Sequence, residues 1–435
     1  MKFFNIKKIF KIISELYFGI FLLALIALTS SFGSFIEQDE PQNFYKENYA
    51  KPIYGFIDSS FLLNFGLDHV YTTWWFFSLL LLFGVSLISC TITRQFPLFF
   101  ISKEFFFKRQ EKSFFELSFS TKIQSLYYFQ ELILGKIQTF HFYLYQKRNV
   151  LYGYKGLIGR ISPILVHFSL IIILTGAFLG AFWNFKVQEV LPKGEIFHIQ
   201  NPLRVGWFSP IPQINTRVND FWVEYQNNRI HQFYSNLSIL DNLGKEIKQQ
   251  TISVNNPLRY NQIDFYQSDW NLLGIRIKDK ETKKIYEFPL FPFENGTKSG
   301  ITWIKEKNEI KSFVVDQFQQ TIFTYDEKGN FLAEKNMGDS MAENSKFIII
   351  EILSSTGLLL KYDPSILILY TGFGLLMLTS SLSYLPYTQI WIFQEKKNCW
   401  IGSSTNRGKI QLEIEFENFL RYLEYQINKT IFVKK

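Results

Sequence analysis

Four long apolar stretches divide the chain, and polar and apolar residues alternate in shorter runs between them. Each stretch holds about 20 residues, the length at which a helix crosses a hydrocarbon core of about 30 Å. We predict transmembrane helices over residues 16–36, 71–92, 162–185 and 364–385. The pattern is typical of a multi-pass α-helical membrane protein with four transmembrane helices, embedded in a lipid bilayer.

The segment between the third and fourth predicted helices, residues 186–362, has a different pattern. It is long enough for a core of its own, and Asn, Asp, Gly and Pro interrupt its apolar runs after a few residues. The runs that read as strands are Ile196–Ile199, Phe221–Tyr225, Gln232–Leu240, Ile275–Ile277 and Phe347–Leu353. We therefore predict a large, mainly β domain at residues 186–362.

Charge divides the segments outside the helices into two groups. Three segments are rich in Lys and Arg: the N-terminus (1–15), the loop 93–161 and the tail 386–435. In the loop 37–70, by contrast, most of the charged residues are acidic. Basic segments stay on the side of the membrane where the protein is made. We expect the first three segments on the cytoplasmic or stromal side, and the loop 37–70 and the β domain on the exported, lumenal side.

The composition suggests the kind of genome that encodes the chain and argues against nucleic acid as a partner. The net charge is +8, but the basic residues gather beside the predicted helices, so the charge does not indicate nucleic-acid binding. The chain holds 48 Phe and is rich in Ile, Lys and Asn, as an AT-rich genome such as a plastid genome would encode. Within the loop 93–161, Phe99–Phe115 mixes aromatic and basic residues, typical of either an amphipathic surface segment or a helix packed on the protein.

The two cysteines exclude several kinds of redox chemistry. Cys90 and Cys399 both fall on the cytoplasmic side of the expected topology, so neither serves an exported disulfide. The sequence contains no Cys-x-x-Cys, with or without a following His, and therefore neither a thioredoxin-like motif nor a c-type haem attachment site. We also find no phosphate-binding loop and no cluster of metal ligands.

His167 is the one ionisable residue inside the predicted helix 162–185. Ionisable side chains within a membrane cost several kcal/mol and usually have a function. Arg160 precedes His167 by seven residues, so the two lie on nearly the same face of a helix. Two alternatives remain open: His167 only bonds a polar group of another helix, and Arg160 only anchors the basic end. The remaining histidines we expect at surfaces or turns, namely His69, His141, His198 and His231.

Several stretches together resemble the ResB/CcsB-like subunit of System II cytochrome c biogenesis, most closely its plastid and cyanobacterial members. The stretch Tyr154–Arg160, continued by Pro163 and His167, is similar to a signature of that family. The other matching stretches are Ile36–Gln38, Trp74–Phe76, Ser89–Thr91 with Arg94, Gln95 and Pro97, Pro192–Glu195, Val254–Tyr260 with Tyr266 and Gln267, and Asp363–Pro364.

The resemblance implies an accessory subunit of a haem-attachment complex rather than an enzyme by itself. Its partners would be a CcsA-type membrane protein and apocytochromes c, in a plastid cytochrome f and the soluble c-type carrier of the thylakoid lumen. Haem would be in transit, with His167 as a candidate axial ligand and Arg160 as a candidate contact for a haem propionate. The expected location is the thylakoid membrane, or in a cyanobacterium the thylakoid or plasma membrane.

Two other functions remain as alternatives. The first is a membrane scaffold or chaperone for an exported apoprotein that binds no haem at His167. The second is a carrier that holds a b-type haem permanently, which usually requires two histidine ligands on facing helices. Only His167 lies within a predicted span, and this weakens the second alternative.

Overall fold

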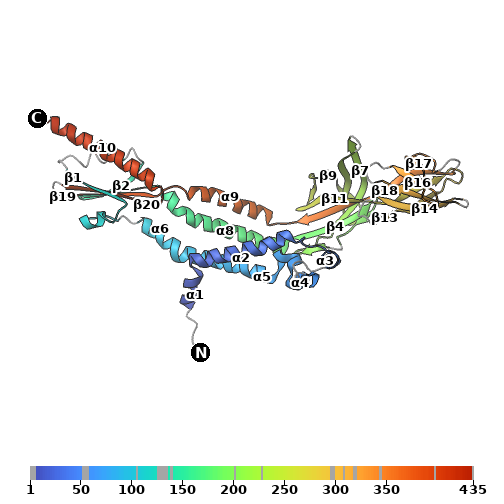
Figure 1. Ribbon diagram of the computed structural model, residues 1–435, viewed down its shortest axis with the longest axis horizontal. Coiled ribbons are helices and arrows are strands. Elements are labelled where there is room, and N and C mark those ends of the chain that lie inside the picture. The colour runs from blue at the N-terminus through green and yellow to red at the C-terminus, as the bar shows by residue number, and fades with distance from the viewer. Residues whose placement is uncertain are drawn as a thin grey trace, which may run out of the picture. The chain divides into compact units, whose positions relative to one another are not determined.

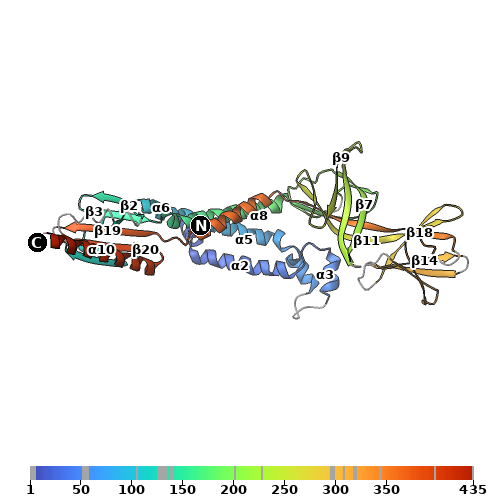
Figure 2. The same cartoon turned by 90° about the horizontal axis from the view of Figure 1, so that it is seen from above.

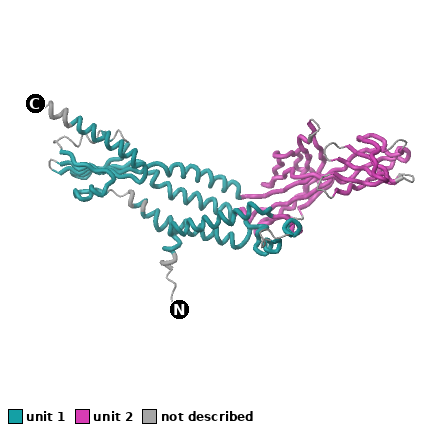
Figure 3. Tube along the Cα trace, in the orientation of Figure 1, with its two compact units in different colours: residues 1–38, 45–178, 365–435 teal, residues 39–44, 179–364 magenta. Residues whose placement is uncertain are grey.

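The computed structural model describes residues 6–50, 58–103, 106–124, 136–137, 141–199, 202–226, 229–293, 299–306, 309–316, 321–341, 345–395 and 398–433. The chain forms two compact units (Figure 3). Unit 1 comprises Met1–Gln38, Tyr45–Phe178 and Ser365–Lys435, and unit 2 comprises Asp39–Phe44 and Leu179–Pro364.

The helices, labelled in Figure 1, belong mainly to unit 1 (Figure 3). Their bounds are α1 (Ile6–Ile13), α2 (Leu16–Phe35), α3 (Gln42–Asn48), α4 (Ser59–Phe65), η1 (Leu67–Thr72), α5 (Trp74–Cys90), η2 (Thr91–Gln95), α6 (Phe96–Lys103), η3 (Glu111–Phe114), α8 (Leu157–Trp183), α9 (Ile366–Leu382) and α10 (Lys409–Val433).

In the described part of the chain, three helices are long and apolar enough to cross a membrane. They are α2, the continuous stretch Trp74–Gln95 formed by α5 and η2, and α8. The apolar helix α9 has 17 residues and a length of about 25 Å, slightly less than the hydrocarbon core. Three of the predicted spans are thus confirmed as apolar helices, and the fourth span stays a prediction.

Apolar side chains hold these helices together. Leu22 of α2 and Phe83 and Leu87 of α5 are buried together, and Leu170 and Leu174 of α8 pack against them. Small residues join α8 to α9. A Cβ atom on Gly176 would lie 3.0 Å from Leu369, and one on Gly372 would lie 2.7 Å from Ile173. Glycine at both positions lets the two helices approach closely.

The basic loop 93–161 and the tail 386–435, predicted separately, contribute strands to one antiparallel sheet of unit 1. Its order is β1-β20-β19-β3-β2, with β1 (Phe119–Gln124), β2 (Tyr143–Lys147), β3 (Val150–Lys155), β19 (Thr388–Glu395) and β20 (Asn398–Thr405). In Figure 2, α10 lies along this sheet. Phe416, Phe419 and Leu423 of α10 cover one face. The other face buries Phe114, so part of the aromatic segment Phe99–Phe115 packs on the protein; Glu104 and Phe105 lie outside the described residues.

Two glycines allow α8 to start directly beneath this sheet. Gly156 has a φ of +75°, a left-handed conformation that ends β3. A Cβ atom at Gly156 or Gly159 would collide with the backbone carbonyl of Pro386 or Leu385, respectively. The helix therefore begins at Leu157, five residues before the predicted start at residue 162, and it includes both Arg160 and His167.

Unit 2 is built from strands. They are β4 (Phe185–Pro192), β5 (Ile196–Phe197), β6 (Pro202–Val205), β7 (Asn215–Gln226), β8 (Arg229–Leu240), β9 (Glu246–Ser253), β10 (Leu258–Tyr260), β11 (Ile263–Asp279), β12 (Ile285–Pro289), β13 (Phe291–Pro292), β14 (Gly300–Glu306), β15 (Glu309–Val315), β16 (Ile322–Tyr325), β17 (Phe331–Lys335) and β18 (Phe347–Tyr362). The mainly β domain predicted for this segment is confirmed. Four of the five runs expected as strands lie within one, whereas only the first half of the run Ile196–Ile199 does, because β5 ends at Phe197.

The long strands β11 and β18 pair along nearly their whole length and carry two cores. At one end, β11, β18 and β4 pack against the sheet β5-β7-β8-β9 through a core that includes Val187, Leu237 and Phe265. At the other end, β11 and β18 pack against the sheet β13-β14-β15-β16-β17 through a core that includes Ile277 and Phe313. The sequence pattern predicted short strands because bulges interrupt the alternation within β11.

Candidate functional site

His167 lies on α8 and contacts two polar side chains of η2, the turn that continues α5. Its Nδ1 is 2.9 Å from the Thr91 hydroxyl oxygen, and its Nε2 is 3.2 Å from the Gln95 amide nitrogen. The side chain is half-buried. Both ring nitrogens therefore have a protein partner within a mostly apolar group of helices.

The Thr91 hydroxyl determines which ring nitrogen carries the proton. Its Oγ1 donates to the Leu87 carbonyl oxygen at 2.8 Å, so it can only accept from His167. Nδ1–H is consequently the donor, and Nε2 carries the lone pair. The Gln95 amide nitrogen donates to that lone pair. The imidazole is neutral, with Nε2 available for a metal if Gln95 moves away.

Thr91 and Gln95 occupy the first and last positions of a single wide turn. Residues Thr91–Gln95 form η2, a π-helical segment in which the Phe96 N–H donates to the Thr91 carbonyl oxygen. Pro97 follows, and its ring lacks an N–H and crowds the carbonyl four residues earlier, that of Thr93. A proline there favours a local departure from α-helical geometry. π-Turns of this kind often occur at functional sites.

Arg160 makes a different contact from the one its helical position suggested. Its guanidinium carbon lies 5.0 Å from the ring centre of Tyr387, beneath the sheet of unit 1, and its Nε is buried without a hydrogen-bond partner among the described residues. The Tyr387 hydroxyl is 3.3 Å from the Tyr152 hydroxyl, which accepts from Gln389. Burial, and then the hydrogen bond to Tyr152, raises the pKa of Tyr387. The structure records no contact between Arg160 and His167.

The other four histidines are exposed, as predicted. Nδ1 of His69 lies 2.8 Å from a carboxylate oxygen of Asp68 in η1, while His141, His198 and His231 lie on the surface. Within the described ranges, no group of three or more His, Cys, Asp or Glu side chains is placed to hold a metal ion. His167 therefore differs from the other four histidines, because its ring is half-buried and both of its nitrogens contact polar side chains.

The sequence alone did not indicate the contacts of Thr91 and Gln95 with His167. Both belong to the stretch that resembles the family, but the pattern assigned them no partner. The available signal was their spacing: two polar residues four apart at the end of an apolar helix lie on one face. Their distance from His167, 76 and 72 residues along the chain, hid the contact.

The arrangement can bind a metal centre through one nitrogen but offers no acid–base pair. A neutral imidazole with a free Nε2 is a normal axial ligand for haem iron. A hydrogen bond from Nδ1 to a second group fixes the ring's tautomer and orientation, and such partners usually matter to metal affinity. Thr91 is placed to do this, and Gln95 caps the atom that would bind.

The sequence comparisons with known proteins agree on one family. The sequence model of the ResB-like family matches residues 16–327. "Cytochrome c biogenesis protein Ccs1" of Thalassiosira pseudonana is 43% identical over 422 residues, which cover 95% of this chain and 100% of that protein. "Cytochrome c biogenesis protein CcsB" of Crocosphaera subtropica is 38% identical over 433 residues, 96% of this chain and 95% of that one.

One solved structure, named "Cytochrome c Heme Lyase CcmF", aligns with 52% of this chain and 24% of its own at 10% identity. Its TM-score of 0.20 is too low to indicate a common fold. The sequence matches are sufficient by themselves, because they extend over nearly the whole chain and include the His167 and Thr91–Gln95 stretches. The chain belongs to the ResB-like family.

Proposed function

We propose that this chain acts in the biogenesis of c-type cytochromes, at the step of haem delivery and covalent haem attachment, together with a CcsA-type membrane partner. Its relatives carry the name cytochrome c biogenesis protein. The observation that carries the proposal is His167, held through Nδ1 by Thr91 with Nε2 facing a displaceable amide. Haem is cargo for this site, and the chain is an accessory subunit of the attachment complex.

The local energetics permit exchange of the Gln95 amide for haem iron. A single neutral hydrogen bond contributes about 1 kcal/mol net, so moving the amide away costs little. The Thr91 contact would remain in place and keep Nε2 directed outward. A ligand held in this way suits cargo that must both arrive and leave.

The topology gives the proposal a direction. With α9 as a fourth span and the positive-inside arrangement, the segment 186–362 would be exported to the lumen, and the basic segments 93–161 and 386–435 would stay on the stromal side. His167 then lies about 15 Å from the stromal end of α8, ten residues after Leu157. Haem entering from that side would meet His167 early. Arg160, near the same end, would contact a propionate if it left Tyr387.

The exported clients in this proposal are apocytochrome f and the soluble c-type carrier of a thylakoid lumen. Their haem-free chains would meet unit 2 on the lumenal side. In a cyanobacterium the same chain would work in the thylakoid or plasma membrane.

One observation favours a second candidate, a scaffold that binds no haem. Both ring nitrogens of His167 are already hydrogen-bonded, which is what a purely structural histidine requires. In that case His167 would fasten α8 to α5, and the exported domain would only hold the apoprotein.

The deciding experiment is an absorption spectrum of the chain purified after co-expression with its CcsA-type partner. We expect haem to co-purify with the wild-type complex and to be lost from His167→Ala at equal protein levels. His198→Ala, an exposed histidine in unit 2, is the matched control and should retain haem. Equal haem content in wild type and His167→Ala would favour the scaffold.

A further inference from the structure

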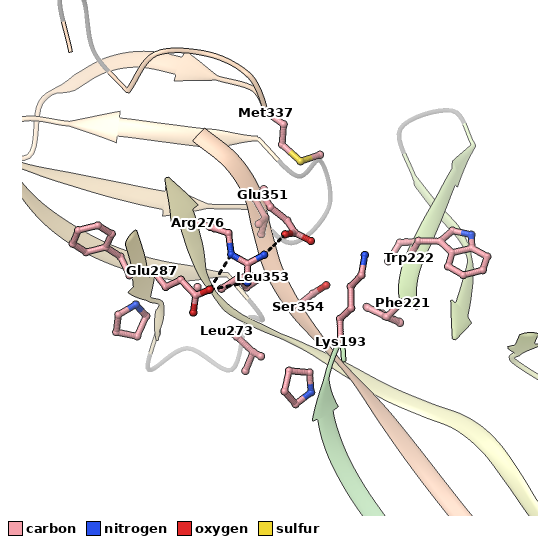
Figure 4. A pocket seen from close by; sticks show the side chains of 16 residues that line it. Lys193, Phe221, Trp222, Leu273, Arg276, Glu287, Met337, Glu351, Leu353 and Ser354 are labelled. Carbon is pink, nitrogen blue, oxygen red and sulfur yellow. Dashed lines mark hydrogen bonds and ion pairs between the residues drawn. The ribbon is translucent and has the colours of Figure 1, made fainter. Parts of the chain in front are cut away.

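A cavity of about 1070 Å³ opens within unit 2 (Figure 4). Phe221 and Trp222 of β7 stand on one side, Leu353 of β18 on another, and Lys193, just after β4, lies between them. Met337 lies near Glu351 at the rim.

The β7 side of the cavity is an open strand edge. One edge of β7 pairs with β8 along the whole strand. The other edge pairs with β5 at Thr216 and Arg217, and Val218 bonds Gly194 and Glu195. At Phe221–Val223, which line the cavity, no strand among the described residues pairs with this second edge.

The β18 side has the same property. One edge of β18 pairs with β11. The other edge pairs with β4 from Ser355 to Tyr362 and forms a bridge from Ile348 to Ser340. Between these contacts, the described part of the chain supplies no strand to Glu351–Ser354, which also line the cavity. Two open edges therefore border one space.

Open strand edges pair readily with another extended chain. We propose that this cavity binds an extended segment of a haem-free apocytochrome by β-strand addition. The inference rests on the proposed function for the identity of the client. Main-chain hydrogen bonds would supply affinity for an extended backbone whatever its side chains. This suits a subunit that serves more than one client, because recognition depends on the client being extended rather than on one sequence.

Haem explains why such a client would be extended before attachment and not after. In a small c-type cytochrome the haem is part of the apolar core, so the haem-free chain would bury less apolar surface against the entropy cost of folding. It would expose backbone and apolar side chains, which Phe221, Trp222 and Leu353 could cover. In the folded, haem-loaded product the backbone hydrogen bonds are made within the cytochrome itself, so the product would leave the cavity.

The charges around the cavity are compatible with entry of a peptide. Arg276 is held on the wall by Glu287 at 2.7 Å and Glu351 at 2.6 Å. Lys193 pairs with Asp220 at 2.9 Å, and both side chains are about half exposed. Exposed pairs contribute little, so a peptide can displace this one. A lysine beside an open edge also discourages pairing between copies of the same chain.

The first test measures binding of a fluorescently labelled, haem-free soluble c-type cytochrome to the full-length protein in nanodiscs. We expect Trp222→Ala to weaken binding about tenfold, as loss of an aromatic anchor commonly does. Trp303→Ala is the matched control: Trp303 is 52% exposed and Trp222 41%, and each lies against one aromatic ring. The haem-loaded cytochrome should bind at least tenfold more weakly than the haem-free form. Equal effects of the two tryptophan variants, or no binding to wild type, would overturn the proposal.

The second test asks whether the backbone edges are used. In hydrogen exchange on the same nanodiscs, the amides of 221–223 and 351–354 should gain protection with haem-free cytochrome and not with the haem-loaded form. Unchanged exchange there would exclude strand addition even if Trp222 mattered. Trp222→Ala should keep the haem content of the complex, so failure of this site and failure of the His167 proposal are separable.

Discussion

The side-chain amide nitrogen of Gln95 lies 3.2 Å from Nε2 of His167, the ring atom that haem iron would bind. The opposite ring nitrogen is held by Thr91. The two neighbours therefore have opposite expected effects on a metal ligand. Thr91 orients the imidazole, whereas Gln95 competes for its lone pair.

Substitutions at Thr91 and Gln95 should separate these effects. Thr91→Val keeps the shape but removes the acceptor for Nδ1–H, and we expect haem affinity of the complex to fall about 10- to 100-fold. Thr91→Ser should restore it. Gln95→Leu should leave affinity equal or higher, since nothing then caps Nε2. Haem titration of the purified complex measures all three, and a loss in Gln95→Leu with none in Thr91→Val would contradict the assignment.

Replacing His167 should block maturation of c-type cytochromes while leaving the protein inserted and bound to its partner. The helix would lose modest packing, whereas haem iron would lose its proposed ligand. Covalent haem on exported cytochromes, quantified at matched protein levels, is the measurement. Added imidazole should restore part of the activity of His167→Ala or His167→Gly by filling the vacated position.

Arg160→Gln provides a graded comparison to the histidine variant. We expect a milder defect than in His167→Ala, because a propionate contact near the headgroups is partly screened by water. Normal haem attachment in His167→Ala would leave the scaffold as the better function for this chain.

Protease protection should establish the orientation of the spans. In sealed membranes treated from the stromal side, we expect a tag placed after Lys435 to be removed and the segment 186–362 to remain intact. The charge bias of the flanking segments is the reason. Detergent should make both accessible. Digestion of 186–362 without detergent would reverse the topology and the proposed direction of haem entry.

Gly372→Ala should destabilise the contact between α8 and α9. The new methyl group would lie 2.7 Å from Ile173 Cγ1 and 3.1 Å from the Ile173 backbone nitrogen. Overpacking of this kind costs about 1–3 kcal/mol. Gly374→Ala is the control two residues away, because a methyl group there meets no atom within 4 Å. Thermal unfolding of the detergent-solubilised protein should show a lower midpoint for Gly372→Ala alone.

The thiol of Cys399 should be inert in the folded protein. It is fully buried in the sheet of unit 1, and burial raises its pKa to about 12. At pH 8 only about one molecule in 10,000 would carry the reactive thiolate. In a Cys90→Ser background, we expect maleimide to label Cys399 only after unfolding. Rapid labelling of the native protein would show that the sheet opens more readily than its packing implies.

Much of this protein could be predicted from local pattern. An apolar run of about 20 residues predicts a helix from its own composition, and three such runs are helices at nearly the predicted positions. The β character of 186–362 follows from short apolar runs between turn residues. His167 stood out because an ionisable residue in an apolar helix is costly wherever its neighbours are.

Only the tertiary structure decided what these residues touch. The contacts of His167 with Thr91 and Gln95, and the sheet that joins β3 to β19, depend on pairing between distant segments. Arg160 shares a helix face with His167 by sequence arithmetic, yet it packs on Tyr387, because α8 starts beneath the sheet. Helix and strand periods constrain a residue's direction relative to its own element. They do not determine which other element lies in that direction, since this depends on how all the apolar faces pack together.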